Sequence, residues 1–345
     1  DGPVIRLEAS AKRRATAAVG LSLMLVGGCT NNPYSSADEG RKVLYGAFAE
    51  APRTLDPAIA YTTTAHRIQG LVFDTPLEYH YLDRPYRLIP GLIREIPEPI
   101  PLPDGRVSYR LRLRSGLLYQ DDPCFELGEP GRTTREVVAA DLAFQIMRIG
   151  DPGLDVQVVD PFSNIDGFAA FRERMIALRA DDPTFKDLPA RERYARADGI
   201  DGLVLHGDHE LEVVLGAPYP QILYWFAMQF TTPVPWESVA YYDGNDGRPR
   251  FADHPVGTGP YKIVTYDKQF RIVLERNPNW YGARHPEWKA PGTVYPSTGE
   301  PEDVAAGRLD PARVGRPLPA IDRVELRREK ESIPTFNKFL QGYYD

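Results

Sequence analysis

The chain has 345 residues, of which 42% are hydrophobic and 26% are charged, a balance that is typical of a folded globular protein. Its formal net charge is −7, and no basic stripe with interleaved aromatic residues occurs, which argues against nucleic acid as a partner. The length is sufficient for two domains, or for one large lobe with an insertion.

The N-terminal segment, residues 1–28, has the pattern of a secretory signal peptide. Three basic residues at positions 12–14 precede an uncharged run of 14 residues, Ala15 to Gly28. A membrane span needs about 20 apolar residues, so this run is too short to remain as an anchor. We therefore expect residues 1–28 to be a signal peptide that is removed on export.

Cys29 directly follows this segment. Val26 lies three positions before it, and Gly27 and Gly28 are small enough to let a peptidase approach the backbone. The pattern resembles the lipobox of bacterial lipoproteins, which predicts lipidation of Cys29. Residues 29–42 are then expected to form a flexible, lipidated tether. A buried apolar helix that happens to end in Gly-Gly-Cys is the alternative.

A strand, a turn and a helix are predicted next. The run 43–48 predicts a first strand, and two prolines between positions 52 and 57 fix a turn after it. Residues 64–73 predict a helix. Between Val107 and Arg114, apolar and polar residues alternate over eight positions, which predicts a half-buried strand with arginines on its solvent face.

The middle of the chain is predicted to contain several helices and one hairpin. Residues Thr133 to Glu136 form a capping-box signature, which predicts a helix from there to about Arg148. The other elements predicted here are helices at 165–179, 191–197 and 219–228 and a hairpin of strands at 202–205 and 210–215.

The C-terminal part begins with a second hairpin, with strands at 261–266 and 270–276. Residues 286–319 are rich in proline and glycine, which predicts a long irregular segment. A strand at 321–326 and a helix at 333–340 are predicted after it.

The sequence offers little catalytic chemistry. It contains no nucleophile elbow, no His-Glu-x-x-His motif and no phosphate-binding loop pattern. His206 and His209 lack a nearby third ligand, so a solvated turn is expected there and no metal site. The segment Gly257-Thr258-Gly259 lacks the third glycine of a dinucleotide fingerprint and is expected to be structural. We therefore expect no catalytic residue, no metal, no cofactor and no enzymatic activity.

A set of short motifs is characteristic in its order and spacing. The motifs are Thr54-Leu55-Asp56-Pro57, Leu88-Ile89-Pro90-Gly91-Leu92, Leu113-Arg114-Ser115-Gly116, Ala140-Asp141-Leu142-Ala143-Phe144, Pro255-Val256-Gly257-Thr258-Gly259-Pro260-Tyr261 and Arg276-Asn277-Pro278-Asn279-Trp280-Tyr281. From about Val43 to Asp345, this set resembles family 5 extracellular solute-binding proteins. These are the oligopeptide- and dipeptide-binding components of ABC importers.

The resemblance implies a fold of the α+β or α/β class, a two-lobed clamshell of the periplasmic-binding-protein type with mixed sheets. On that pattern, residues 43–60 and 200–319 build lobe one. Residues 61–199 form a subdomain inserted into it. Residues 320–345 begin lobe two, which is truncated because the sequence stops there.

The resemblance also implies a ligand-binding segment. In family members the residues after Leu-Asp-Pro line the cleft and pair with an extended ligand through backbone groups, and here these are Ala60, Tyr61, Thr62 and Thr63. Phe162 matches a position that places an aromatic ring at the cleft. The alternatives are an ordinary loop for the four residues and core packing for Phe162.

The function implied is that of a periplasmic or cell-surface, membrane-anchored lipoprotein. It is expected to be monomeric, to capture peptides between two lobes, and to deliver them to an ABC permease in the inner membrane. One alternative is the same fold binding a sugar, a metal chelate or haem. Another is a secreted glycoside hydrolase, which predicts a pair of cleft carboxylates about 5–9 Å apart.

Overall fold

The protein is represented by a computed structural model that describes residues 34, 38–80, 82–244, 250–288, 290 and 292–345. The chain divides into two units, Asp1–Gly40 and Arg41–Asp345, and the second unit is described below by itself. The signal peptide predicted at residues 1–28 and the lipidation predicted at Cys29 lie outside the described residues. Within the described part of the chain, no helix combines the length and apolar character that crossing a membrane requires.

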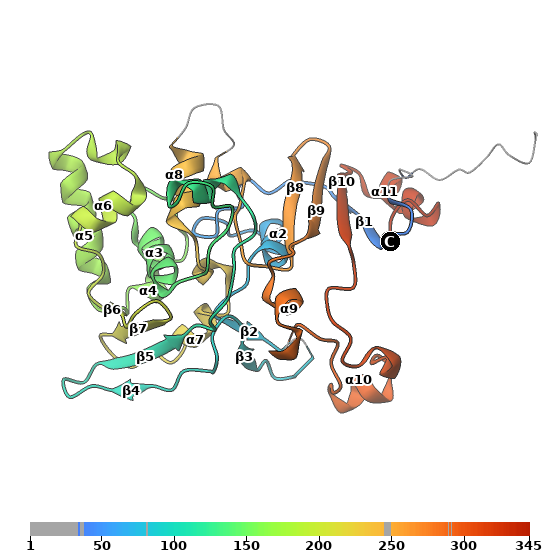
Figure 1. Ribbon diagram of the computed structural model, residues 1–345, viewed down its shortest axis with the longest axis horizontal. Coiled ribbons are helices and arrows are strands. Elements are labelled where there is room, and N and C mark those ends of the chain that lie inside the picture. The colour runs from blue at the N-terminus through green and yellow to red at the C-terminus, as the bar shows by residue number, and fades with distance from the viewer. Residues whose placement is uncertain (1–33, 35–37, 81, 245–249, 289, 291) are drawn as a thin grey trace, which may run out of the picture. The chain divides into compact units, whose positions relative to one another are not determined.

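One four-stranded sheet, called sheet one below, joins segments from the beginning and the end of this unit. Its strands, in spatial order, are β1 (Val43–Phe48), β10 (Arg323–Arg328), β9 (Arg271–Arg276) and β8 (Tyr261–Asp267). β10 is parallel to β1 and antiparallel to β9, and β8 and β9 form the predicted hairpin. Figure 1 shows the red strand β10 between the blue strand β1 and the orange strand β9.

Strand β10 lies beyond the domain boundary predicted at residue 320, and it pairs with strands on the other side of that boundary. Residues 320–345 were expected to begin a second lobe, but β10 is an inner strand of the sheet that β1 belongs to. Its Val324 is buried in the same core as Leu274 of β9 and Tyr261 of β8. Because an inner strand bonds to neighbours on both sides, sheet one is incomplete without it.

A second four-stranded sheet, sheet two, is antiparallel throughout. Its strands, in spatial order, are β4 (Ile100–Pro101), β5 (Val107–Arg112), β7 (Glu210–Leu215) and β6 (Leu203–Leu205). The alternation predicted for β5 holds from Tyr109 to Arg112, because Tyr109 and Leu111 are buried whereas Arg110 and Arg112 form ion pairs with Glu210 at the surface. Ser108, on the predicted solvent face, is an exception, because it is fully buried. A small third sheet pairs β2 (Leu77–Tyr79) with β3 (Leu88–Pro90).

Sheet two also crosses the boundary that was expected at residues 199 and 200. β5 lies in the segment assigned to the inserted subdomain, whereas β6 and β7 lie in the segment assigned to lobe one. Sheet two therefore contains strands from both predicted segments.

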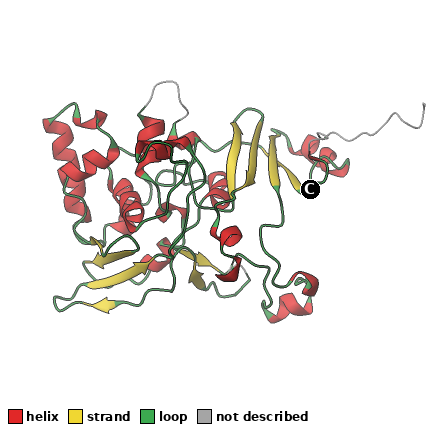
Figure 2. Cartoon of the chain, in the orientation of Figure 1, coloured by secondary structure: helices red, strands yellow, loops and turns green. Residues whose placement is uncertain are grey.

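Helices cover sheet two and separate the sheets along the chain (Figures 1 and 2). The α-helices are α2 (Thr63–Val72), α3 (Ala139–Gly150), α4 (Val159–Phe162), α5 (Phe168–Asp181), α6 (Ala190–Arg196), α7 (Ile222–Trp225), α8 (Trp236–Asp243), α9 (Tyr281–Arg284), α10 (Pro301–Ala305) and α11 (Ser332–Leu340). Short 3-10 helices occur at Pro123–Leu127, Phe185–Asp187, Gln229–Thr231, Phe251–Asp253, Pro286–Trp288 and Pro311–Arg313. The helix predicted at 219–228 is reduced to α7, with turns on both sides.

The capping box predicted at Thr133 is wrong. The segment that carries it is extended, and its backbone bonds to the segment before it, with the Tyr119 N–H donating to the Arg135 carbonyl at 3.1 Å. The Thr134 hydroxyl donates to the Tyr119 carbonyl at 2.6 Å, so it is not available to cap a helix. Helix α3 therefore begins later, where the Asp141 carboxylate accepts the backbone N–H of Val138 at 3.0 Å.

Two hydrophobic cores underlie this architecture. The larger core contains the inner face of sheet two together with residues of α3, α5 and α8. The smaller core lies under sheet one and includes Ile68 and Val72 of helix α2. Helix α2 thus packs on sheet one, and both ends of this helix carry the candidate site described next.

Candidate functional site

The predicted ligand-binding residues 60–63 form the entry to helix α2. Ala60 is buried, whereas Tyr61 is 62% exposed. The Thr62 hydroxyl caps the helix by accepting the backbone N–H of Ala65 at 3.2 Å, and Thr63 is the first helical residue. Within the described structure, the backbone N–H groups of Tyr61 and Thr62 have no hydrogen-bond partner. These donors are therefore available to a ligand at an exposed turn.

Tyr61 begins a chain of aromatic rings. Its ring stacks on Phe230 with centroids 6.1 Å apart, and His66 meets the same Phe230 ring edge-on at 5.6 Å. Phe230 lies 6.3 Å from Trp225, which in turn lies 6.0 Å from Phe162. The structure thus connects Tyr61 and Phe162, two of the residues named from the sequence, through two rings that lie between them.

Phe162 itself lies in the larger core with no exposed surface. It ends helix α4, and Trp225, its aromatic neighbour, ends helix α7. In this conformation the Phe162 side chain packs against other core residues and does not face a ligand. Only Tyr61, Thr62 and Thr63 among the five predicted residues present exposed side chains.

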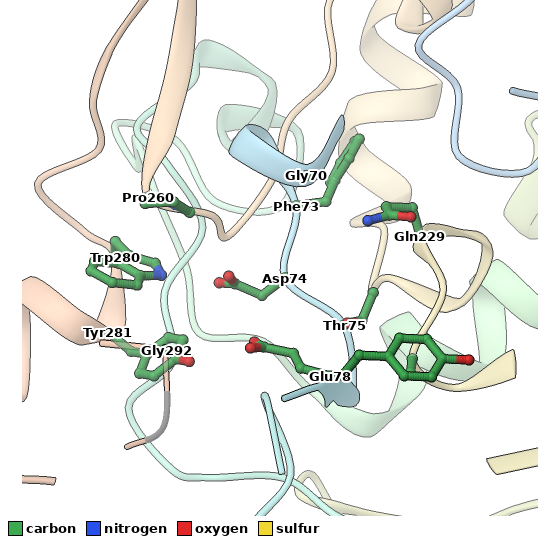
Figure 3. Close-up of a pocket in the computed structure, with 12 residues that line it drawn as sticks. Gly70, Phe73, Asp74, Thr75, Glu78, Gln229, Pro260, Trp280, Tyr281 and Gly292 are labelled. Atoms are coloured by element: carbon green, nitrogen blue, oxygen red, sulfur yellow. The ribbon is translucent and has the colours of Figure 1, made fainter. Parts of the chain in front are cut away.

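A cavity of about 340 Å³ lies at the other end of helix α2 (Figure 3). Two acidic residues and several aromatic rings line it. The lining residues are Gly70, Phe73, Asp74, Thr75, Glu78, Tyr79, Ala227, Gln229, Pro260, Trp280, Tyr281 and Gly292. Gln229 lines this cavity and also contacts the Tyr61 cluster, the group of rings formed by Tyr61, His66 and Phe230. Its side-chain oxygen lies 2.8 Å from Nδ1 of His66.

Asp74 is held at the cavity by backbone contacts on both sides. Its carbonyl accepts the Thr232 hydroxyl at 2.7 Å, and its N–H donates to the Thr258 hydroxyl at 3.3 Å. The Thr258 segment can approach this closely because its neighbours are glycines: a Cβ on Gly257 would lie 2.0 Å from the Val72 carbonyl oxygen. The glycines predicted to be structural thus allow the chain to pass directly over the end of helix α2.

Glu78 reaches the cavity from strand β2, which is paired with β3. A Cβ on Gly292 would lie 3.2 Å from the Glu78 carboxylate, and Gly292 has a φ of +84°. The irregular segment 286–319 therefore passes close to Glu78 at Gly292, whose positive φ favours glycine over residues with a side chain.

Trp280 and Tyr281 are positioned by the asparagines that precede them. The Asn277 side-chain amide donates to the Gly259 carbonyl at 2.9 Å, and that of Asn279 donates to the Tyr119 carbonyl at 3.1 Å. Both amides are buried, so the turn before helix α9 is fixed. Figure 3 shows the indole nitrogen of Trp280 turned toward Asp74.

Burial controls the protonation of the two carboxyl groups. It raises the pKa of Asp74 to about 7, and the nearby Thr258 hydroxyl and Trp280 indole offset only part of this increase. Burial also raises the pKa of Glu78 to about 8; the charge of Asp74 adds to this effect and Arg114 opposes it. Burial and these two carboxylates raise the pKa of Tyr281, so its phenol stays protonated.

This cavity was not predicted from the sequence. Asp74, Glu78 and Trp280 come from three segments that are brought together only by the packing of helix α2, strand β2 and the turn before helix α9. Asp74 lies just beyond the end of helix α2 without belonging to it, and Glu78 lies in strand β2. The signal that the sequence did carry was the motif ending in Trp280 and Tyr281. Among the described residues no cluster of three metal-ligating side chains occurs.

Comparison with known proteins supplies the family context. Residues 98–345 match the family model described as bacterial extracellular solute-binding proteins, family 5 Middle. The protein described as probable ABC transporter periplasmic-binding protein SapA, from Escherichia coli (strain K12), is 25% identical over 219 residues, which are 61% of this chain and 34% of that protein. The chain thus spans about a third of the length of this curated relative.

Solved structures show the same fold. Listeria monocytogenes OppA bound to peptide superposes with a TM-score of 0.59 at 14% identity, covering 89% of this chain and 46% of that one. The substrate-binding domain of an oligopeptide ABC transporter from Bacillus anthracis str. Ames gives a TM-score of 0.58 at 17% identity, covering 89% and 45%. The predicted fold class, that of two-lobed periplasmic binding proteins with mixed sheets, is confirmed.

Proposed function

Because this chain belongs to the bacterial extracellular solute-binding proteins, family 5, we propose that it captures peptides outside the cytoplasm for an ABC permease in the inner membrane. The observation that carries this proposal is the family match over residues 98–345. Two similar proteins support the proposal. SapA of Escherichia coli is described as a probable ABC transporter periplasmic-binding protein, and Listeria monocytogenes OppA was solved with a bound peptide.

The entry to helix α2 supports a peptide as the ligand. An extended peptide that adds to exposed backbone groups gains affinity from main-chain hydrogen bonds and needs few side-chain contacts. Tyr61 and Thr62 offer unpaired backbone N–H groups beside the exposed Tyr61 ring, and Thr63 follows at the surface. We therefore keep Ala60, Tyr61, Thr62 and Thr63 as the segment along which the peptide lies, with Phe162 as the more distant end of the ring chain behind it.

The mechanism is capture by closure of two lobes. Ligand held between the lobes favours the closed form, and the permease binds that form best, so ligand shifts a hinge equilibrium. The chain acts as a monomer and needs no covalent chemistry, metal or cofactor for this. Since the chain spans about a third of its curated relative, this mechanism is proposed for the whole receptor.

The first residues of the sequence support a location at the membrane surface outside the cytoplasm. Signal-peptide removal at Cys29 and lipidation of its thiol would hold the receptor at the membrane surface by the tether 29–42. A Cys29→Ser variant is then released into the soluble envelope fraction, and the wild-type mass exceeds that of the polypeptide by the attached lipid. An unmodified mature mass would remove the lipid anchor from the proposal but leave peptide capture intact.

The hydrolase alternative has one observation in its favour. Asp74 and Glu78 are two carboxyl groups in one cavity, as a glycosidase requires. The family match and the relatives named as binding proteins favour binding. Incubation with nitrophenyl glycosides distinguishes the two, because hydrolysis that Glu78→Gln abolishes would establish an enzyme.

Native mass spectrometry of the protein purified from its host tests peptide capture. Short peptides of mixed sequence that leave on mild activation are expected. A bound sugar, metal chelate or haem would show that the same fold serves another solute.

A further inference from the structure

The Asp74 and Glu78 carboxyl groups face one cavity without a compensating cation. Neither forms an ion pair or accepts a side-chain hydrogen bond from a basic residue among the described residues. Arg114 is the basic group that acts on Glu78, but its Nε donates to the Gly91 carbonyl at 3.1 Å and its guanidinium lies 5.7 Å over the Trp288 ring. A buried carboxylate is costly unless it is paired, so this arrangement is incomplete on its own.

Two buried polar atoms at the cavity are also without partners. Oδ2 of Asp74 and Nε1 of Trp280 form no hydrogen bond of normal length and angle in the described structure, although the indole lies close enough to Asp74 to lower its pKa. Asp74 is 8% exposed and Trp280 is 4% exposed, so neither deficit is met by bulk solvent. Figure 3 shows both groups directed toward the cavity. Buried polar groups are normally satisfied, which indicates a polar occupant.

The occupant must be mainly a hydrogen-bond donor. The two carboxyl groups together present several acceptor sites, against the single donor of Trp280. An ammonium group carries three N–H donors and a guanidinium carries five, and both carry the positive charge that the site lacks. The aromatic rings of Tyr79, Trp280 and Tyr281 line the same cavity, and ring faces attract cations.

The size of the cavity limits the occupant to part of a ligand. Its volume of about 340 Å³ is at the lower end of the range of about 300–1,000 Å³ for small-molecule pockets. It can admit one side chain or one terminal group but not a whole peptide. The cavity and the entry lie at opposite ends of helix α2, and Gln229 contacts both of them. A ligand that lies at the entry can therefore place one of its groups toward this cavity.

We propose that the Asp74–Glu78 cavity is a subsite for one primary ammonium or guanidinium group of the bound ligand. This proposal rests on the proposed function in that the ligand is a peptide, and it adds a preference for a cationic group at one position. Asp74 and Glu78 accept N–H bonds from this group, and the ring faces of Trp280 and Tyr281 flank it. The Trp280 N–H, a donor that such a cation cannot satisfy, is turned toward Asp74 (Figure 3).

Peptides that differ only in their cationic groups test the proposal on the wild-type protein. Acetyl-Ala-Lys-Ala-amide carries only the side-chain ammonium, Ala-norleucine-Ala-amide only the terminal one, and acetyl-Ala-norleucine-Ala-amide carries neither. The first or the second is expected to bind at least about tenfold more tightly than the third, since a hydrogen bond to a charged group contributes about 1.5–3 kcal/mol. Which of the two gains identifies the source of the cation.

Three variants locate the effect. Asp74→Asn and Glu78→Gln keep the shape of the site and are expected to reduce the preference for the cationic peptide at least about tenfold. Glu173→Gln, on the exposed face of helix α5, removes the same charge elsewhere and is expected to leave the preference unchanged. Circular dichroism spectra of the variants confirm that each is folded, and the comparison of peptides on the wild type needs no variant.

The possible outcomes separate this proposal from the proposed function. Equal binding of all three peptides overturns the cation subsite and leaves peptide capture standing. Binding of n-butylammonium that Asp74→Asn abolishes, with no binding of any peptide, supports the subsite and contradicts peptide capture. Absence of binding by every probe overturns both.

Discussion

Arg148 of helix α3 forms a buried, two-pronged ion pair with Asp56, with Nη1–Oδ1 and Nη2–Oδ2 distances of 2.8 and 2.6 Å. The pair joins the motif Thr54-Leu55-Asp56-Pro57 to helix α3, the helix that also carries the motif Ala140–Phe144. Arg148 is 2% exposed and its guanidinium also lies 5.2 Å over the ring of Phe251. The pair therefore fixes the segment that leads into the entry of helix α2.

Removing one partner of this pair should destabilise the fold strongly. Asp56→Ala leaves the Arg148 charge buried without compensation, and we expect a loss of about 3–5 kcal/mol in the free energy of unfolding. The double variant Asp56→Ala with Arg148→Met should lose less than the sum of the single variants, because no isolated charge remains. Urea titration monitored by tryptophan fluorescence measures both, and additive losses would contradict the coupling.

The raised pKa values of Asp74 and Glu78 predict how stability depends on pH. In an unfolded chain such carboxyl groups titrate near about pH 4, whereas in the fold their pKa values are about 7 and about 8. The folded protein thus holds more protons between these limits, and the free energy of unfolding should fall as pH rises from about 4 to 8, then level off. Tyr281 stays neutral over this range, because burial and the two nearby carboxyl groups raise its pKa.

Asp74→Asn should remove part of this dependence. The variant is expected to be more stable than the wild type by about 3–4 kcal/mol at pH 8, since the pKa of Asp74 rises from 3.8 to about 7 and one pKa unit corresponds to about 1.4 kcal/mol. At pH 4 the two proteins should be nearly equal. Melting temperatures at the two pH values check this, and a wild-type protein that gains stability between pH 5 and 8 relative to the variant would refute it.

Gly257 is predicted to tolerate no side chain. A Cβ there would lie 2.0 Å from the Val72 carbonyl oxygen and 2.8 Å from the Phe73 ring, so Gly257→Ala must push the segment away from helix α2. Since overpacking costs about 1–3 kcal/mol, the free energy of unfolding should fall by at least that amount. Gly216→Ala is the matched control, because its Cβ would meet nothing nearer than 3.9 Å. Equal stability of the two variants would show that the segment adapts freely.

Tyr61 and Phe162 should respond differently to truncation. Tyr61→Ala removes an exposed ring and is expected to weaken peptide binding while leaving the melting temperature nearly unchanged. Phe162→Ala opens the larger core and is expected to cost about 3–5 kcal/mol of stability. Phe270→Ala, at the exposed tip of the β8–β9 hairpin, is the control for loss of a surface ring. Calorimetric titration and thermal melting measure the two effects, and unimpaired peptide binding by Tyr61→Ala would remove Tyr61 from the site.

Elements with a clear periodicity were predictable from the sequence. The alternation in β5 and the two hairpins that contain β7 and β9 reflect burial on one face, which depends on local pattern alone. The helix start at Thr133 was not predictable, because the Thr134 hydroxyl bonds to Tyr119 across the fold. Local propensity allows either a helix or an extended segment at Thr133, and hydrogen bonds to residues distant in sequence stabilise the extended segment.

The candidate site could be predicted only where it is local in sequence. The segment 60–63 follows one motif directly, and in it Tyr61 is exposed whereas Ala60 is buried. The Asp74–Glu78 cavity depends on Trp280, about 200 positions further along the chain, and on glycines that let Thr258 pass over the end of helix α2. The pairing of β10 and β5 with strands across the predicted domain limits was not predictable for the same reason, since their partners are distant in sequence.

The most direct test of peptide capture is calorimetric titration of ligand-free protein with a mixture of short peptides. The same amino acids in unlinked form, at equal total concentration, are the control. The account predicts saturable heat with the peptides and none with the free amino acids. Saturable binding of the free amino acids alone, or no saturable heat with the peptides, would contradict it.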